Sequence, residues 1–310
     1  FIFQNMHFIL PNKNARTCPV TSNELETVKQ QIVKGENITD NASYDDVYSY
    51  HPGGQLRLSF DKSRAEKYLR YTDYETSQTG VHFKDKNGVW DRVSFTSMAD
   101  KAVITKLSKS SEGAKLNLTL SFDDISTLAN FGDGCETDLK YKKLTAADGS
   151  YLALVAHYPN YENSELKGGG YATVTYVVTS GKKERVSLDK NTDEEQFSGD
   201  NQGVKITDAD NVYLLTVSER TYDMGKYSDF EKQSDFALVD ECVATLKSIA
   251  EKYGNDKFDY DTALKNHLAI YQPQFDAVEL KLGDDSFDSN EKLLKAQKRK
   301  KEINSDIAQR

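Results

Sequence analysis

The feature that most restricts the fold is a run of short segments, from about residue 55 to residue 218, in which apolar and polar residues alternate. In "KLNLTLSF" the apolar side chains are Leu116, Leu118, Leu120 and Phe122. A period of two places all four on one face of a strand, which can be buried while the other face stays polar. "QLRLSF", which begins at Gln55, repeats the pattern. This part of the chain is therefore predicted to form strands with one buried face.

Further segments of the same run are rich in β-branched and aromatic residues, which favour strands. They are "DKAVITKL", "SYLALVAHY", "GYATVTYVVTSG" and "VYLLTVS". Turn-forming clusters lie between them, namely "HPGG", "DKNG", "FGDG", "AADG" and "SGDNQG". Because no helical pattern separates the strands, the layout favours an antiparallel sandwich over a parallel α/β sheet. The predicted fold class is mainly β, a large antiparallel β-sandwich with a few helices.

One helix is predicted before the strands, in "TSNELETVKQQIVKG". Thr21 and Glu24 have the spacing of a capping box, in which two side chains satisfy free backbone N–H groups of the first turn. Three apolar residues share one face of this helix: Leu25, Val28 and Ile32. Gly35 can end it, because glycine readily adopts the left-handed conformation that follows many helices.

The pattern becomes helical after residue 230. "SDFALVDECVATLKSIAEKYG" has apolar residues at helical spacing: Val239, Cys242, Leu246, Ile249 and Tyr253. A second helix is predicted to begin near Asp259, and Pro273 should kink or end it. The alternating stretch "AVELKLG", residues 277–283, then predicts one more strand.

Composition excludes several classes of function. The 310 residues include 40 basic and 49 acidic side chains, so the net charge of −9 would repel a nucleic-acid backbone. No stretch approaches the roughly 20 apolar residues of a membrane-spanning helix. The three cysteines (Cys18, Cys135 and Cys242) lack the paired spacing of a zinc site and are expected to be free thiols. No metal and no cofactor are expected.

Two groups of acidic residues flank the apolar part of "ADNVYLLTVSERTYD". Asp208 and Asp210 have a D-x-D spacing that can serve calcium, but a turn at the strand entry is the favoured interpretation. Glu219 and Asp223 could form the pair of carboxylates that glycoside hydrolysis uses, although an acidic β protein offers many such pairs. Trp90 could stack on a sugar, but a place in the core is favoured for it.

Several segments resemble, in order, the N-terminal domain of family 95 glycoside hydrolases, the α-L-fucosidase and α-L-galactosidase type. They are "ELETVKQQIVKGENITDNASYDDVYSYHPGGQLRLSF", "AEKYLRYTDYETSQTGVHFKD", "WDRVSFTSMADKAVITKLS", "GVKITDADNVYLLTVSERTYD" and "YDTALKNHLAIYQPQFDAVELKLG". The third is similar to a pattern R-E-x-F-x-S-x-P-D-x-V-I, and the last to a pattern Y-x-x-L-L-x-x-H. The sequence departs from the family's patterns at Arg92, Ala99 and Ala277. The resemblance covers about residues 20–283.

The resemblance implies a β super-sandwich over residues 1–230, incomplete at its N-terminus. Residues 231–310 would be linker helices, with a returning strand near 277–283, leading to a helical (α/α)₆ toroid outside this chain. In the family that toroid carries the catalytic acid and the asparagines that activate water. We therefore expect a scaffold domain with no catalytic residue, inactive alone, whose partners are the toroid and, through it, a fucosylated or α-L-galactosyl glycan. In the family the loops of the first segment approach the sugar site, so Asn5 or His7 would contact the substrate.

Other functions remain open at this point. A glycan substrate suggests a secreted or cell-surface protein, and no signal peptide is recognisable in "FIFQNMHFILP". A stand-alone carbohydrate-binding or adhesion module would also be a β-sandwich, with exposed aromatic side chains that stack on sugars. A degenerate hydrolase domain kept for folding or assembly is a third possibility.

Overall fold

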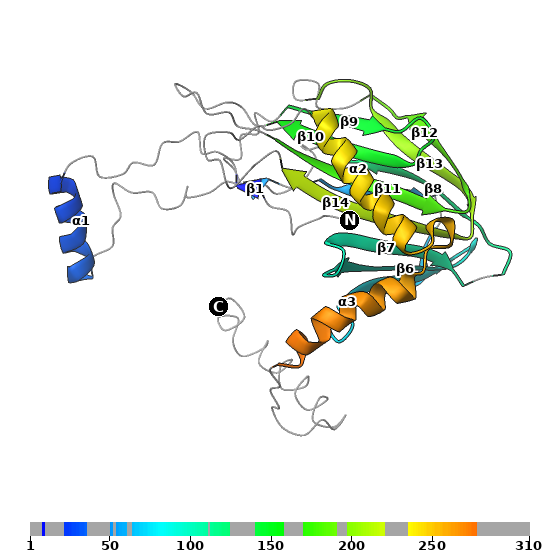
Figure 1. Cartoon of the computed structure of the whole chain (residues 1–310), viewed down its shortest axis with the longest axis horizontal. Helices are drawn as coiled ribbons and strands as arrows, with labels where there is room; N and C mark the ends of the chain where they lie inside the picture. The colour runs from blue at the N-terminus through cyan, green and yellow to red at the C-terminus, as the bar shows by residue number, and fades with distance from the viewer. Residues whose placement is uncertain are drawn as a thin grey trace.

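The computed structural model describes residues 8–9, 22–35, 50–51, 54–60, 64–110, 112–124, 140–157, 170–190, 197–220 and 235–277. Figure 1 shows two stacked sheets with helices lying across one face of the stack. A separate two-stranded pair is made by β1 (Phe8–Ile9) and β2 (Tyr50–His51). The mainly β, antiparallel sandwich predicted from the alternating segments is confirmed.

Eight strands form the larger sheet, in the order β4-β5-β6-β7-β14-β11-β10-β9. Their bounds are β4 (Glu66–Asp73), β5 (Gln78–Asp85), β6 (Gly88–Ser97), β7 (Ala102–Lys109), β14 (Asn211–Arg220), β11 (Gly170–Thr179), β10 (Tyr151–His157) and β9 (Lys140–Thr145). Every neighbouring pair is antiparallel. The strand of "VYLLTVS" lies in the middle, where both of its faces are covered.

Four strands form the smaller sheet, in the order β12-β13-β8-β3. Their bounds are β12 (Lys182–Ser187), β13 (Gln202–Ala209), β8 (Leu116–Phe122) and β3 (Leu56–Phe60). These pairs are also antiparallel. The two strands with the clearest alternation in the sequence, β3 and β8, therefore pair with each other.

Apolar side chains of both sheets fill the space between them. The four residues that share the inner face of β8 are at most 4% exposed: Leu116, Leu118, Leu120 and Phe122. Asn117, on the opposite face, is exposed as the alternation predicts. The four buried side chains of β8 belong to one cluster with side chains of the larger sheet such as Leu152, Leu154, Val177, Val212 and Leu214. Each burial of a leucine, valine or phenylalanine side chain contributes about 1.5–3 kcal/mol, so this layer holds the two sheets together.

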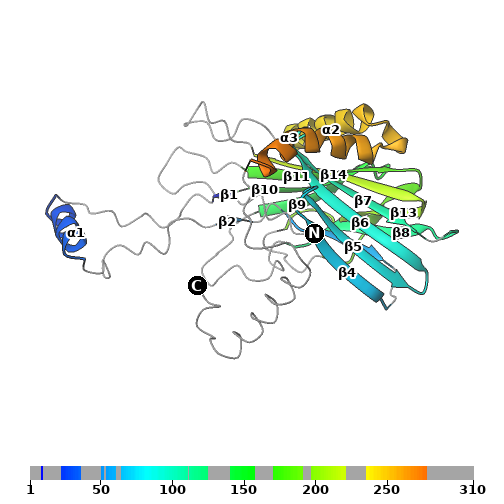
Figure 2. The ribbon, with the colours of Figure 1, turned by 90° about the horizontal axis from the view of Figure 1, so that it is seen from below.

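A second core lies between the larger sheet and two helices, α2 (Asp235–Lys252) and α3 (Tyr260–Phe275), which are joined through the short helix η3 (Asn255–Lys257). The five residues predicted to share a face of α2 are all buried: Val239, Cys242, Leu246, Ile249 and Tyr253. That helix packs on β10, β11 and β14. Figure 2 shows both helices on the same side of the larger sheet, the side opposite the smaller sheet.

Glycine, aspartate and proline residues lie at the ends of α2 and α3. Gly254 has a φ of 97°, the left-handed conformation that ends a helix. Asp259 caps α3, since its side chain accepts a hydrogen bond from the backbone N–H of Thr262 at 3.0 Å. Pro273 lies inside the last turn of α3, and the helix ends two residues later at Phe275.

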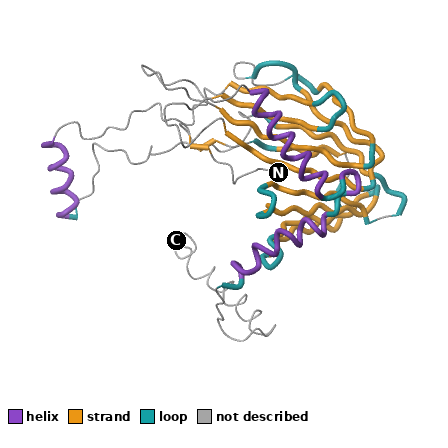
Figure 3. The backbone as a smooth tube through the Cα atoms, in the orientation of Figure 1, coloured by secondary structure: helices purple, strands orange, loops and turns teal. Residues whose placement is uncertain are grey.

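The early helix is also present, as α1 (Ser22–Lys34), and Gly35 follows it with a φ of 66°. In Figure 3 it lies apart from the strands. Leu25 and Ile32 are 46% and 57% exposed, so the apolar face predicted for this helix is not buried against the sheets.

Several predictions fall outside the described residues. They concern Asn5, His7, Cys18, Cys135, Asp223, the boundary near residue 230 and the strand from residue 278 onward. Among the helices that are described, none is both long and apolar enough to cross a membrane.

Candidate functional site

The two aspartates of the D-x-D stretch lie in different places: Asp208 is at an irregularity in the pairing of β13 with β8, and Asp210 is between β13 and β14. Asp208 has a φ of 59°, and its backbone N–H donates to the side-chain oxygen of Asn117 at 3.0 Å. Asp210 accepts from two lysines, Lys109 Nζ at 3.0 Å and Lys115 Nζ at 2.9 Å. Hydrogen bonds from Lys115 and Lys109 lower the pKa of the Asp210 carboxyl. Asp210 therefore fits the turn at a strand entry that the sequence favours, whereas Asp208 is a residue of β13.

Glu219 lies near the end of β14, on the face of the larger sheet that α2 covers. Partial burial raises the pKa of its carboxyl. The charge of Lys101 lowers that pKa, and the charge of Glu241 raises it further. The thiol of Cys242 lies close by, and burial together with the two glutamates raises its pKa to about 12. Glu219 thus contributes to the contact between helix and sheet. The hypothesis of a catalytic pair with Asp223 is not tested within the described ranges.

Trp90 is a core residue. Its side chain is 8% exposed and belongs to the cluster between the sheets. The indole Nε1–H donates to Asp85 Oδ1 at 2.9 Å, and the same oxygen accepts from the backbone N–H groups of Asn87 and Gly88. The favoured interpretation of Trp90 is confirmed, and a buried ring cannot serve as a platform for sugar.

Metal ligands are not clustered in the part of the chain that the structure describes, where no three His, Cys, Asp or Glu side chains come together. Cys242 is a buried free thiol, as predicted. An open hollow at the β12–β13 connection is lined by Ser187, Leu188, Lys190, Phe197, Gly199, Asp200 and Asn201. Asn201 there is engaged with the carbonyl of Asp189 at 2.6 Å and with Lys143 Nζ at 3.1 Å, so it holds the connection together.

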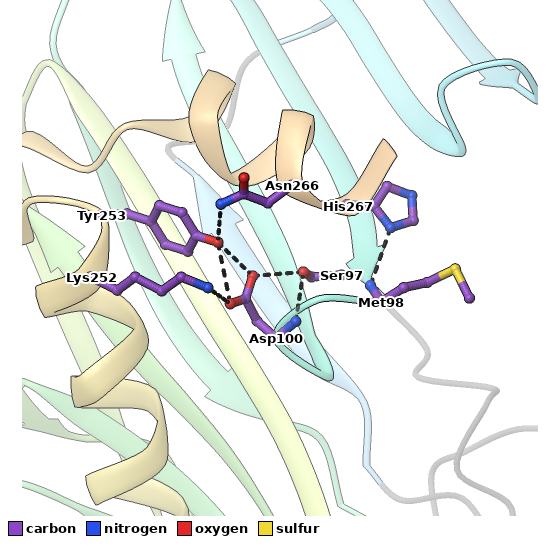
Figure 4. Close-up of polar contacts among 7 residues, drawn as sticks. All are labelled: Ser97, Met98, Asp100, Lys252, Tyr253, Asn266 and His267. Carbon is purple, nitrogen blue, oxygen red and sulfur yellow. Dashed lines mark hydrogen bonds and ion pairs between the residues drawn. The ribbon is translucent and has the colours of Figure 1, made fainter. Parts of the chain in front are cut away.

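A cluster of polar side chains joins the turn between β6 and β7 to the helices (Figure 4). We call it the Asp100 junction, and its members are Ser97, Asp100, Lys252, Tyr253 and Asn266. Asp100 Oδ1 accepts from Lys252 Nζ at 2.7 Å. The Tyr253 hydroxyl lies 3.2 Å and 3.0 Å from the two carboxylate oxygens of Asp100. That hydroxyl accepts in turn from Asn266 Nδ2 at 3.1 Å, which ties α3 to the same group.

The turn that carries Asp100 is fixed by its own residues. Ser97 Oγ donates to Asp100 Oδ2 at 2.7 Å and lies 3.1 Å from the backbone nitrogen of Asp100. The backbone N–H of Lys101 donates to the carbonyl of Ser97 at 2.8 Å, and Lys101 has a φ of 54°. The aspartate is therefore held in place by its turn as well as by the helices.

The junction is suited to holding elements together rather than to proton transfer. The Asp100 side chain is only 3% exposed, whereas that of Lys252 is 48% exposed. Hydrogen bonds to Asp100 and Tyr253 raise the pKa of the Lys252 ammonium, so it stays charged. Because the carboxylate oxygens already accept from a lysine, a tyrosine and a serine, they fix the orientation of α2 and α3 on the sheet.

His267 lies beside the junction, on α3. Its ring is 1% exposed, with centroids 5.2 Å from Phe95 and 5.3 Å from Tyr271. Nδ1 accepts from the backbone N–H of Met98 at 3.1 Å, so the proton of the neutral ring is on Nε2. Nε2 has no hydrogen-bond partner among the described residues. Burial lowers the pKa of this imidazole, which therefore stays neutral at neutral pH.

Sequence reasoning missed the junction as a site. The segment "SMAD" has the spacing of a serine–aspartate turn, but its partners lie about 150 residues further along the chain. The two patterns of the family resemblance do include Asp100, as the acid of S-x-P-D, and His267, as the histidine of L-L-x-x-H. The family patterns therefore include residues that hold the helices on the sheet, but the patterns do not indicate this role.

Comparison with known proteins identifies the kind of domain. The model of the glycosyl hydrolase family 65 N-terminal domain matches residues 11–225, more than half of the chain. None of the curated proteins matches the sequence. One similar solved structure is a putative kojibiose phosphorylase from human microbiome, with 11% identity and a TM-score of 0.42 over 74% of this chain and 28% of that one. Another is a bacterial glucoamylase complexed with acarbose, with 12% identity and a TM-score of 0.36 over 71% and 31%.

The chain thus spans less than a third of the length of these two solved structures. The expectation of an N-terminal domain of a glycoside hydrolase is confirmed, and the family that matches is described as family 65 where family 95 was expected. The chain belongs to the glycosyl hydrolase family 65 N-terminal domain family.

Proposed function

We propose that this chain is the non-catalytic scaffold domain of a glycoside hydrolase, and that it orients a catalytic helical toroid through α2 and α3. The observation that carries the proposal is the order of parts along the chain. A sandwich whose sequence matches an N-terminal hydrolase domain is followed by two helices that are fastened to its sheet. Helices in this position are suited to transmit the orientation of the sheet to whatever follows them.

The Asp100 junction supports a positioning role. It joins three segments, the β6–β7 turn, the end of α2 and the middle of α3, through hydrogen bonds of 2.7–3.2 Å. Its central carboxylate is buried and accepts from a serine, a lysine and a tyrosine, which favours a rigid connection. A domain that supplied the chemistry would instead need an accessible acid and base at a fixed separation.

We further propose that the substrate is a fucosylated or α-L-galactosyl glycan. The support for this finer point is the resemblance of five segments, in order, to family 95 enzymes. Two departures from the family pattern lie in described parts of β6 and its turn. Arg92 is partly buried on β6, where desolvation lowers its pKa, and Ala99 precedes Asp100 in the turn between β6 and β7.

The proposal is tested by comparing two lengths of the protein. The 310-residue chain should not hydrolyse nitrophenyl α-L-fucoside, whereas a chain extended along the same reading frame should, with less activity toward an α-D-glucoside. Turnover by the 310-residue chain that is lost in Glu219→Gln or Asp223→Asn would overturn the scaffold assignment. Preference of the extended chain for the glucoside would overturn only the substrate class.

A second candidate is the carbohydrate-binding module. The specific observation in its favour is a group of exposed aromatic residues at the edge of the larger sheet, among them Tyr71 and Tyr74, which are 40% and 72% exposed. A reading frame that stops at Arg310, together with glycan binding by the isolated chain, would favour this candidate over the scaffold.

A further inference from the structure

Part of the larger sheet's helix-covered face is left open at its β4 edge. The strand register places Tyr71 opposite Gly80, Leu69 opposite His82, and His82 opposite Asp91, so these side chains share a face. Tyr71 and Leu69 are 40% and 56% exposed. The side chains of His82 and Asp91 are 42% and 30% exposed. An aromatic ring, an imidazole and a carboxylate therefore lie side by side at the surface.

The ring of Tyr71 lies over Gly80 on the neighbouring strand. A Cβ added to Gly80 would meet Cζ of Tyr71 at 2.2 Å, and Cε1 and the hydroxyl at 2.4 Å. The far end of the ring thus occupies the space that any other residue would fill at this position. Glycine inside a strand is unfavourable unless another group covers it, and an aromatic ring from the neighbouring strand does so. One side of the ring rests on the backbone, and the exposed part faces solvent.

The polar groups beside the ring are fixed in orientation. His82 Nδ1 lies 2.6 Å from Asp91 Oδ1, and Ser110 Oγ donates to Asp91 Oδ2 at 2.6 Å. Because an ionised carboxylate only accepts hydrogen bonds, the proton of this contact belongs to His82 Nδ1. The Nε2 atom of His82 and the remaining lone pairs of Asp91 can then accept hydrogen bonds from other donors.

The spacing of these groups suits a single sugar ring. Tyr71 and His82 are diagonal neighbours on adjacent antiparallel strands, and such residues are separated by about 7–8 Å. A pyranose has an apolar face made of C–H groups and a rim of hydroxyl groups. A ring lying on Tyr71 would therefore bring hydroxyl groups within reach of an acceptor on His82 and of the Asp91 carboxylate. Binding of a flat polypeptide or a lipid surface would not require two fixed hydrogen-bond acceptors beside one aromatic ring.

We propose that Tyr71, His82 and Asp91 form a surface site for one neutral pyranose residue of a glycan, which we call the Tyr71 platform. Tyr71 stacks on the C–H face, and His82 and Asp91 accept from hydroxyl groups. Acidic sugars are disfavoured by the exposed carboxylate and by the net charge of −9. The inference rests on the proposed function only for the choice of fucose and galactose among the first sugars to test. The aromatic residue proposed to contact the sugar is therefore Tyr71 and not Trp90, which is buried.

The test is direct binding of sugars to the 310-residue chain. The probes are the methyl glycosides of α-L-fucose, α-L-galactose, α-D-glucose and α-D-mannose at millimolar concentration, and binding is measured by saturation-transfer NMR and calorimetry. At least one should bind, and Tyr71→Ala should weaken it about tenfold, which corresponds to a loss of about 1.4 kcal/mol of stacking on the aromatic ring. Tyr71→Phe should stay within about twofold of the unaltered chain. Asp91→Asn should weaken binding while leaving the thermal unfolding midpoint nearly unchanged.

Tyr74→Ala is the matched control, because Tyr74 is a more exposed tyrosine in the adjacent hairpin turn and lies outside the platform. It should bind as the unaltered chain does. The platform is refuted if none of the four sugars binds, or if Tyr71→Ala and Tyr74→Ala weaken binding equally. It is also refuted if Tyr71→Ala leaves binding intact. Fucoside turnover by the extended chain is scored separately, so failure of the platform leaves the scaffold proposal standing.

Discussion

Asp100 and Lys252 form an ion pair between positions 152 residues apart, with Oδ1 and Nζ separated by 2.7 Å. The two partners differ in exposure, since the aspartate side chain is 3% exposed and the lysine 48%. The exposed ammonium can be solvated by water when the pair is broken, but the buried groups around the carboxylate cannot. The pair is therefore asymmetric, and the two single substitutions should have unequal effects.

Asp100→Ala should lower the free energy of unfolding by about 2–4 kcal/mol. The substitution leaves the Tyr253 hydroxyl and Ser97 Oγ without their acceptor in a region shielded from water. Lys252→Met should cost about 1 kcal/mol or less, because half of that side chain is solvated and Asp100 keeps its other two donors. Urea unfolding of both variants measures the difference. Equal losses in the two variants would mean that the ion pair, and not the buried acceptor, carries the stabilisation.

Stability should fall as the pH drops below about 6.5, because of His267. Burial lowers the pKa of the folded imidazole below its unfolded value. Between those two values the unfolded chain binds more protons, so acid favours unfolding. Protonation of Nδ1 would also abolish its hydrogen bond from the backbone N–H of Met98.

The matched variant for this pH dependence is His267→Gln, which can still accept from Met98 but does not titrate. At pH 7.5 the unaltered chain should be the more stable of the two. Its advantage should shrink as the pH falls below 6.5, measured as the difference between urea midpoints at each pH. A difference that stays constant from pH 7.5 to pH 5 would show that His267 does not titrate differently on folding.

Parts of the fold with a one-sided apolar pattern were predictable from sequence. β8 and α2 each have a single buried face, so their periodicity reports burial directly. β9 and β12 were not predicted as strands, because "YKKLT" and "KKERVS" carry too many charged residues to alternate. Both lie at sheet edges. Lys143 in β9 is nonetheless 4% exposed, because its ammonium meets Asp124 at 2.6 Å, a partner that the local pattern does not reveal.

The candidate sites were less predictable, for the same physical reason. The Asp100 junction and the packing of Tyr71 on Gly80 both depend on which segments become neighbours in three dimensions. A local pattern encodes a turn at Asp100 and a strand at Tyr71, but not their partners. The favoured interpretations of Asp210 and Trp90 were correct because turn chemistry and core burial are local or compositional properties.

Gly170→Ala should destabilise the protein more than Gly80→Ala. At Gly170 a Cβ would lie 2.3 Å from the backbone oxygen of Ala156, so the pairing of β10 with β11 would have to shift. At Gly80 the clash is with the end of the Tyr71 side chain, which can rotate away. We expect a loss of about 2 kcal/mol or more for the first and about 1 kcal/mol or less for the second.

Thermal and urea unfolding measure both glycine variants. The second variant has a further expected effect, because displacing the Tyr71 ring should weaken sugar binding to the Tyr71 platform. Similar stabilities for the two variants would mean that the strands can adjust at Ala156, or that the Tyr71 ring is held more firmly than its exposed position implies.

Cys242 should be unreactive in the folded protein. Its thiol is 2% exposed under α2, and its pKa of about 12 leaves almost no thiolate at pH 8. In a variant with Cys18→Ser and Cys135→Ser, a disulfide reagent should modify Cys242 only as fast as α2 leaves the sheet. Adding Asp100→Ala, which removes the anchor at the end of α2, should accelerate the modification. Rapid labelling of the folded variant, unchanged by Asp100→Ala, would contradict the assignment of the junction as the contact that holds this helix.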